Sequence, residues 1–138
     1  MTGLERFVEA QAPVYPTALA ELRNGRKQSH WMWFVFPQIA GIGSSATARH
    51  YAIQSRAEAK DYSAHPLLGA RLVECTEAVL AHSNVPPQAI FGSVDAMKFR
   101  SSMTLFDAVT GKSGSRFAQA LAAFFGGEPD PATLRLLG

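Results

Sequence analysis

The residues of this chain that could do chemistry gather in one aromatic segment, residues 27–38. The segment reads KQSHWMWFVFPQ and contains both tryptophans of the chain. If it is helical, one face carries, at helical spacing, Lys27, His30, Trp31, Phe34 and Gln38. Aromatic walls with a few polar groups at the rim are typical of small-ligand pockets. The segment therefore suggests a pocket in which a tryptophan stacks on a ring and His30 carries a proton near neutral pH.

A second candidate group follows later in the chain, where Asp95, Lys98 and Ser102 are spaced i, i+3 and i+7. On a helix these three side chains share one face. We expect Lys98 and Ser102 to face the same pocket, and Lys98 and Lys27 to hold an anionic group there. The simpler interpretation is a surface ion pair beside a solvated serine.

A glycine-rich turn, GIGSSA at 41–46, matches a G-x-G-x-x-A pattern. Pro37 interrupts the apolar run before it, and no pattern of a parallel sheet follows, so we reject a dinucleotide-binding fold. A glycine turn leading into a helix leaves N–H groups free, and Ser44 and Ser45 add hydroxyls. The turn is therefore a candidate seat for a phosphate or carboxylate, with an ordinary capped loop as the alternative.

Other chemistries find less support in the residue spacing. The four histidines, His30, His50, His65 and His82, lack the spacing of metal ligands, so we predict no metal site and no cofactor. The single cysteine, Cys75, lies on an apolar helix face and is predicted to be a core residue. Neither a nucleophile elbow nor a phosphate-binding P-loop is present.

The elements that position these residues are predicted to be helices. Apolar residues recur at helical spacing along two stripes: Leu68, Leu72, Cys75 and Val79, and then Ala96, Phe99, Met103, Phe106 and Val109. No run of alternating residues indicates a sheet. We predict a mainly α fold, a single compact domain over residues 1–138 with about six helices.

Capping signals predict where the helices begin and end. A proline disfavours helix in the residue before it, so the aromatic segment should form a helix that ends near Phe36. A helix capped by Ser45 or Thr47 should run through Ile53. Further caps are expected at Ser55, Ser93, Ser115 and Asp130.

Composition narrows the class of protein. The chain has 138 residues, of which 47% are hydrophobic, so a disordered chain is excluded. A net charge of +2 does not favour a nucleic-acid or membrane partner. The longest apolar run, residues 31–37, is far shorter than the ~20 residues of a membrane span, and no signal peptide is recognisable. We expect a cytoplasmic protein.

Five motifs, which together cover nearly the whole chain, form a specific pattern: Leu4-Glu5-Arg6-Phe7, Lys27-x-x-His30-Trp31-Met32-Trp33-Phe34-Val35-Phe36-Pro37-Gln38, Phe91-Gly92-x-x-Asp95-x-x-Lys98, Ser101-Ser102-Met103-Thr104-Leu105-Phe106 and Phe125-Gly126-Gly127-x-Pro129-Asp130. With these motifs the chain resembles the bacterial domain of unknown function 1810 family. The resemblance implies a mainly helical domain and no established activity. A fainter similarity, to small proteins proposed to act on ADP-ribose-type or riboflavin-pathway metabolites, carries over no positions and adds support for a nucleotide-like ligand.

These observations lead to one main hypothesis about function. The protein is expected to bind a small anionic, nucleotide-like ligand, with or without catalysis. The residues assigned to the site are His30 as proton carrier and, for binding, Lys27, Trp31, Trp33, Gln38, Ser44, Ser45, Lys98 and Ser102. The alternative is a non-enzymatic interaction or adaptor domain whose Trp and Phe cluster is purely core. The oligomeric state is left open.

Overall fold

Helices make up most of the chain in the computed structural model, which describes residues 3–111 and 115–138. Within them lie α1 (Glu5–Gln11), α2 (Tyr15–Arg23), α3 (Met32–Val35), α4 (Ala46–His50), α5 (Arg56–Ala64), α6 (Leu68–Leu80), α7 (Pro87–Phe91), α8 (Ser93–Thr110), α9 (Arg116–Phe125) and α10 (Pro131–Leu137). The mainly α prediction is confirmed. The predicted number of about six was too low for the described ranges, where three of the helices, α3, α4 and α7, have only four or five residues.

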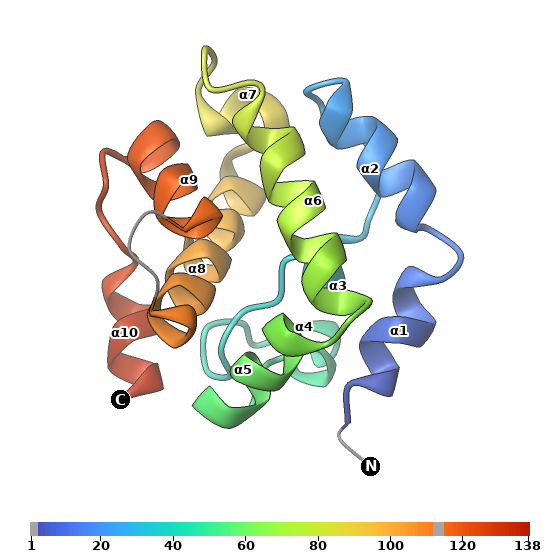
Figure 1. Ribbon diagram of the computed structural model, residues 1–138, viewed down its shortest axis with the longest axis vertical. Helices are drawn as coiled ribbons and strands as arrows, with labels where there is room; N and C mark the ends of the chain where they lie inside the picture. Colours follow the sequence, from blue (N-terminus) through green and yellow to red (C-terminus); the bar gives the residue numbers. More distant parts are fainter. Residues whose placement is uncertain (1–2, 112–114) are drawn as a thin grey trace.

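The helices surround one hydrophobic core, with α6 at its front (Figure 1). The helix α2 contacts one side of α6 and α9 contacts the other, while α8 contacts α5, α7, α9 and α10. The short α3 lies behind α6 in this view. None of the helices in the described ranges is long and apolar enough to cross a membrane.

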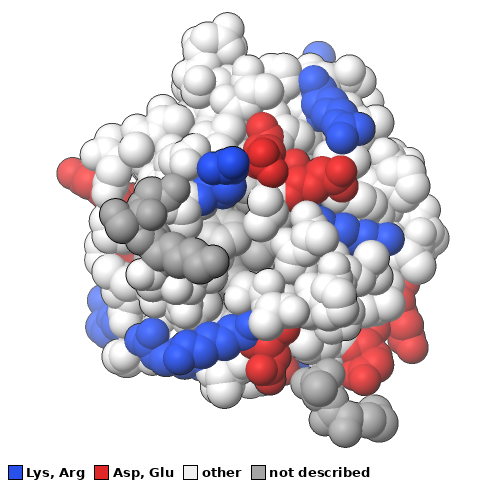
Figure 2. Space-filling view, viewed as in Figure 1, with Lys and Arg blue, Asp and Glu red and all other residues white. Residues whose placement is uncertain are grey.

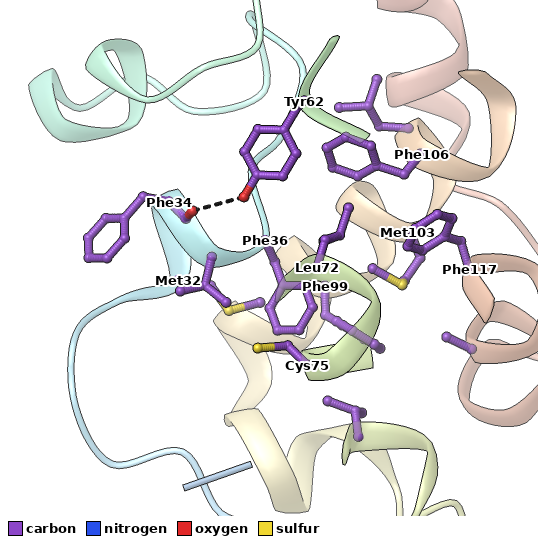
Figure 3. Packing of buried hydrophobic residues seen from close by; sticks show 14 of the residues in the cluster. Met32, Phe34, Phe36, Tyr62, Leu72, Cys75, Phe99, Met103, Phe106 and Phe117 are labelled. Carbon is purple, nitrogen blue, oxygen red and sulfur yellow. Dashed lines mark hydrogen bonds between the residues drawn. The ribbon is translucent and has the colours of Figure 1, made fainter. Parts of the chain in front are cut away.

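Both predicted apolar stripes are buried in this core. Leu68, Cys75 and Val79 of α6 have no exposed surface, and Leu72 is 1% exposed. In α8 the stripe from Ala96 to Val109 is buried as well. Figure 3 shows Leu72 and Cys75 in the same core as Phe99 of α8. The stripe predictions are thus confirmed.

Cys75 is a core cysteine, as predicted. Burial, together with smaller effects of its neighbours, raises the pKa of its thiol to about 12. A thiol in this environment remains protonated near neutral pH and is a poor nucleophile.

Four of the predicted caps are confirmed, at Ser45, Ser55, Ser115 and Asp130, and the one at Ser93 is wrong. Ser55, Ser115 and Asp130 each accept a backbone N–H in the first turn of α5, α9 and α10. Ser93 is not a cap, because α8 begins at this residue and the cap is Gly92, whose φ of 81° suits glycine. The helix capped by Ser45 ends at His50, since Ile53 instead pairs with Ile39 in an isolated parallel bridge.

The aromatic segment is mostly not helical, contrary to our prediction. Only Met32–Val35 form a helix, which ends before Phe36 as the following proline predicts. Residues 26–31 follow an irregular path, in which the N–H groups of residues 26–29 bond to Glu21 and Ile90 and not in a helical i to i−4 pattern. The helical face that would join Lys27, His30 and Gln38 therefore does not exist.

Candidate functional site

Lys27 and Lys98 meet at one carboxylate, although they lie in distant parts of the sequence. Lys27 Nζ is 2.8 Å from Asp95 Oδ2, and Lys98 Nζ is 3.3 Å from Asp95 Oδ1. We call Lys27, Asp95 and Lys98 the lysine cluster. Two ammonium groups share one carboxylate, so the cluster carries a net charge of +1.

Each lysine of the cluster also lies over a tryptophan ring. Lys27 Nζ is 5.1 Å from the centroid of the Trp31 ring, and Lys98 Nζ is 4.7 Å from that of Trp33. Both distances are within the range of cation–π attraction. The structure therefore brings together four of the residues that we assigned to the site, from two separate segments.

The two lysines of the cluster, and the tryptophans beneath them, differ in their access to solvent. The side chain of Lys27 is 9% exposed, whereas that of Lys98 is 23% exposed. Trp31 is buried, while Trp33 is only partly buried. Lys98 of the cluster and the neighbouring Trp33 are therefore the residues that a ligand can reach. The buried Trp31 cannot stack on a ligand.

The fold positions the cluster through α7 and α8. Asp95 and Lys98 occupy the first two turns of α8, one helical turn apart. The backbone N–H of Lys27 donates to the carbonyl of Ile90 in α7 at 2.8 Å, and α7 packs against α8. This bond brings the irregular segment next to the start of α8.

A buried pair of polar side chains fixes α3, which carries Trp33. Gln11 Nε2 and the hydroxyl of Tyr62 both donate to the carbonyl of Phe34, at 2.7 and 3.2 Å. Gln11 comes from α1 and Tyr62 from α5, so three elements are joined at this carbonyl. Figure 3 shows the bond from Tyr62. A helix of four residues gains little stability from its own hydrogen bonds, and these contacts stabilise it instead.

Glu21 holds the irregular segment and was missed by our sequence analysis. Its carboxylate accepts four hydrogen bonds at 2.6–3.0 Å: from Gln28 N–H, Ser29 N–H, the Ser29 hydroxyl and Trp31 Nε1. Burial acts to raise the pKa of Glu21, but these bonds outweigh it and lower the pKa to about 2. The available signal was a glutamate next to Leu22 on the apolar side of α2.

In the described chain, no side-chain hydrogen bond or ion pair joins the remaining predicted site residues to the lysine cluster. His30 is exposed and forms no hydrogen bond or ion pair there, and Gln38 is half-buried. Ser44 is exposed, and the Ser45 hydroxyl caps α4. Ser102 is fully buried, so neither the solvated serine of the simpler interpretation nor an open pocket wall describes it.

Ser102 is unusual for another reason. Of the buried side-chain nitrogen and oxygen atoms in the described residues, its Oγ is the one without a hydrogen-bond partner. The neighbouring Ser101 is also buried, but its Oγ lies 2.8 Å from the hydroxyl of Thr133.

Four surface cavities border other parts of the described chain, and none of these four is lined by Lys27, His30 or Lys98. The largest, of about 870 Å³, follows the outer face of α6, where Glu74 and Glu77 border small apolar residues. On this face acidic and basic side chains are interspersed (Figure 2). In the described ranges no three His, Cys, Asp or Glu side chains are placed to hold a metal ion.

Comparison with known proteins places the chain in a family. Residues 1–137 match the family model DUF1810, a protein family of unknown function, and the chain belongs to this family. It is similar to the crystal structure of the conserved hypothetical protein Rv1873 from Mycobacterium tuberculosis, with 50% sequence identity and a TM-score of 0.94. That match covers 97% of this chain and 95% of the other. No curated protein matches the chain.

Proposed function

We propose that this member of the DUF1810 family binds a small anionic, nucleotide-like molecule at the lysine cluster. The observation that carries the proposal is that Lys27 and Lys98 share the single carboxylate of Asp95. One positive charge is therefore left without a partner, next to the partly buried ring of Trp33.

The position of the cluster adds to its attraction for an anion. Asp95 and Lys98 lie at the N-terminal end of an 18-residue helix, where the helix dipole is positive. Partial burial of Lys98 strengthens its Coulomb interaction relative to a fully solvated ammonium group. An anionic group at this end of α8 would thus meet both a cation and a favourable dipole.

The proposal gives the members of the cluster different tasks. Lys27, the more buried lysine, neutralises Asp95, and this leaves Lys98 available to the ligand. An anion that draws Lys98 Nζ away from Trp33 would free the indole face for a planar ring. His30 is assigned no proton-transfer role, because within the described chain its exposed imidazole has no hydrogen bond or ion pair to the cluster.

A second candidate function, an interaction domain, has its own supporting observation. Trp31, Phe34 and Phe36 are buried, so most of the aromatic segment serves the core. The 870 Å³ groove on α6 is then a surface against which another protein could pack.

Thermal-shift and fluorescence titrations test the proposal. Wild-type protein would be titrated with AMP, ADP-ribose and sugar phosphates. A ligand at about 100 times its dissociation constant stabilises the folded state by about 2.7 kcal/mol and raises the melting temperature. Stacking on Trp33 should also quench its emission, which a Trp33→Phe variant identifies.

Lysine variants identify the binding site. We expect Lys98→Met to abolish the shift and Lys27→Met to weaken binding about tenfold, since Asp95 then pairs with Lys98 alone. Lys60→Met, at an exposed position of α5, is the matched control and should bind like wild type. Equal shifts in all four proteins would show that the lysine cluster does not hold the anion.

A further inference from the structure

We infer that Glu21 is a positioning residue of the anion site, which sets the affinity for the ligand by fixing the segment that presents Lys27. The inference rests on the proposed function. It assigns Glu21 no contact with the ligand; the residue acts through the backbone of residues 26–31 and through Trp31.

Glu21 supplies nearly all the hydrogen-bond acceptors that this segment uses. Its backbone carbonyl accepts the N–H of Arg26 at 3.0 Å, and its carboxylate accepts those of Gln28 and Ser29. Between them, the N–H of Lys27 donates to Ile90. Each backbone N–H from 26 to 29 is thus bound, three of them to one residue, and the Lys27 side chain starts from a fixed backbone.

The Glu21 carboxylate also reaches Lys27 through Trp31. It accepts the indole N–H at 2.9 Å, and Lys27 lies over the same indole. Hydrogen bonding to a carboxylate makes the ring more electron-rich and so strengthens its attraction for a cation. A continuous series of contacts then runs from Glu21 through Trp31, Lys27 and Asp95 to Lys98.

The chemistry at position 21 requires a carboxylate. All four of its partner groups are donors, and an ionised carboxylate only accepts. A glutamine would turn an NH₂ group toward some of these donors. Glu21 is only 9% exposed, yet no cation pairs with it in the described chain. Its negative charge is therefore stabilised by the hydrogen bonds from residues 28–31.

The consequence for binding follows from the shared carboxylate. If residues 26–31 lose their anchor, Lys27 no longer holds Asp95 in place. Asp95 then pairs with Lys98 alone, and the cluster attracts an anion less strongly. Removing Glu21 should therefore act on affinity in the same way as removing Lys27.

A double-mutant cycle with AMP as the probe tests this coupling. In otherwise wild-type protein, Glu21→Gln should raise the dissociation constant for AMP about tenfold, as Lys27→Met does. In the Lys27→Met background the same change should have no further effect on the dissociation constant, because the lysine that Glu21 positions is already absent. Glu77→Gln, at an exposed glutamate of α6, is the control and should leave the affinity unchanged.

Hydrogen exchange provides a readout that needs no ligand. In Glu21→Gln, exchange of the Gln28 and Ser29 amides and of the Trp31 indole should accelerate at least tenfold, while the amides of α6 stay protected. If Glu21→Gln does not fold, Ser29→Ala removes one of the four donors and should give smaller changes of the same kind.

The outcomes separate the two proposals. Tight AMP binding by Glu21→Gln, or equal loss of affinity with and without Lys27, would overturn the positioning role and leave the proposed function intact. Wild-type protein that binds none of the probes would overturn the proposed function and the positioning role with it. Faster exchange in Glu21→Gln would then show only that Glu21 supports the fold.

Discussion

The helix α6 and the segment of residues 26–31 lie in the same molecule but are held in place by different forces. Four residues of α6 at helical spacing are buried among apolar neighbours. The segment has no regular structure, and hydrogen bonds to Glu21 and Ile90 hold it. The predicted site residues that meet in space belong to this segment, to the adjoining α3 and to the start of α8.

The difference shows how each region responds to change. Apolar contacts are non-directional, so we expect α6 to lose stability mainly in proportion to the buried volume that a substitution removes. Hydrogen bonds to a carboxylate are directional, so the segment depends on the identity of one residue. Substitutions in α6 should therefore lower global stability at every pH, whereas those around Glu21 should change local geometry and the dependence of stability on pH.

The largest effect is expected for Leu72→Ala in α6. The side chain is 1% exposed, and its removal leaves a cavity in the core, which should reduce the free energy of unfolding by about 2–5 kcal/mol. Urea denaturation measures this change. The matched control is Val73→Ala, at a half-buried position of the same helix, and should cost about 1 kcal/mol. Equal losses at both positions would contradict the assignment of the buried face.

The next effect concerns the pH dependence that Glu21 creates. Folding lowers the pKa of its carboxylate from 4.5 to about 2. The charged form is thus favoured in the folded state, and its contribution to stability, at most about 3 kcal/mol, is present above pH 4.5 and lost as the pH falls toward 2. Urea denaturation of wild type and Glu21→Gln between pH 7 and pH 3 should show curves that converge in acid.

A control separates this effect from that of other carboxylates. Glu77→Gln removes an exposed glutamate and should leave the pH dependence parallel to that of wild type. Parallel curves for Glu21→Gln as well would mean that its hydrogen bonds do not favour the charged form.

The smallest effect is expected at Ser102, where a buried hydroxyl lacks a partner. Ser102→Ala removes an unsatisfied polar group and should leave stability unchanged or raise it by up to about 1 kcal/mol. Ser101→Ala removes the hydrogen bond to Thr133 and should cost about 1 kcal/mol. Thermal unfolding of both variants checks the contrast, and a loss at Ser102 as large as that at Ser101 would show that its hydroxyl has a partner.

Periodic features were predictable from the sequence because each depends on local spacing. The stripes of α6 and α8 follow from one apolar face per helix, and the caps at Ser55, Ser115 and Asp130 follow from short-range hydrogen bonds. The aromatic segment was misread for the same reason. Its residues have helical spacing, but the acceptors for its first N–H groups lie on Glu21 and Ile90. Both residues are outside the segment, so the spacing of its own residues could not reveal them.

By itself, the sequence determined that the chain folds into a mainly helical protein whose apolar stripes form a core, and it identified Lys27, Trp33 and Lys98 as candidates. Only the tertiary structure decided that the two lysines share Asp95, that Trp31 and Ser102 are buried, and that His30 is exposed. The physical reason is that a helix face is set by residues three or four apart. A charge cluster, in contrast, depends on how distant segments pack, and here the backbone bond from Lys27 to Ile90 brings the two segments together.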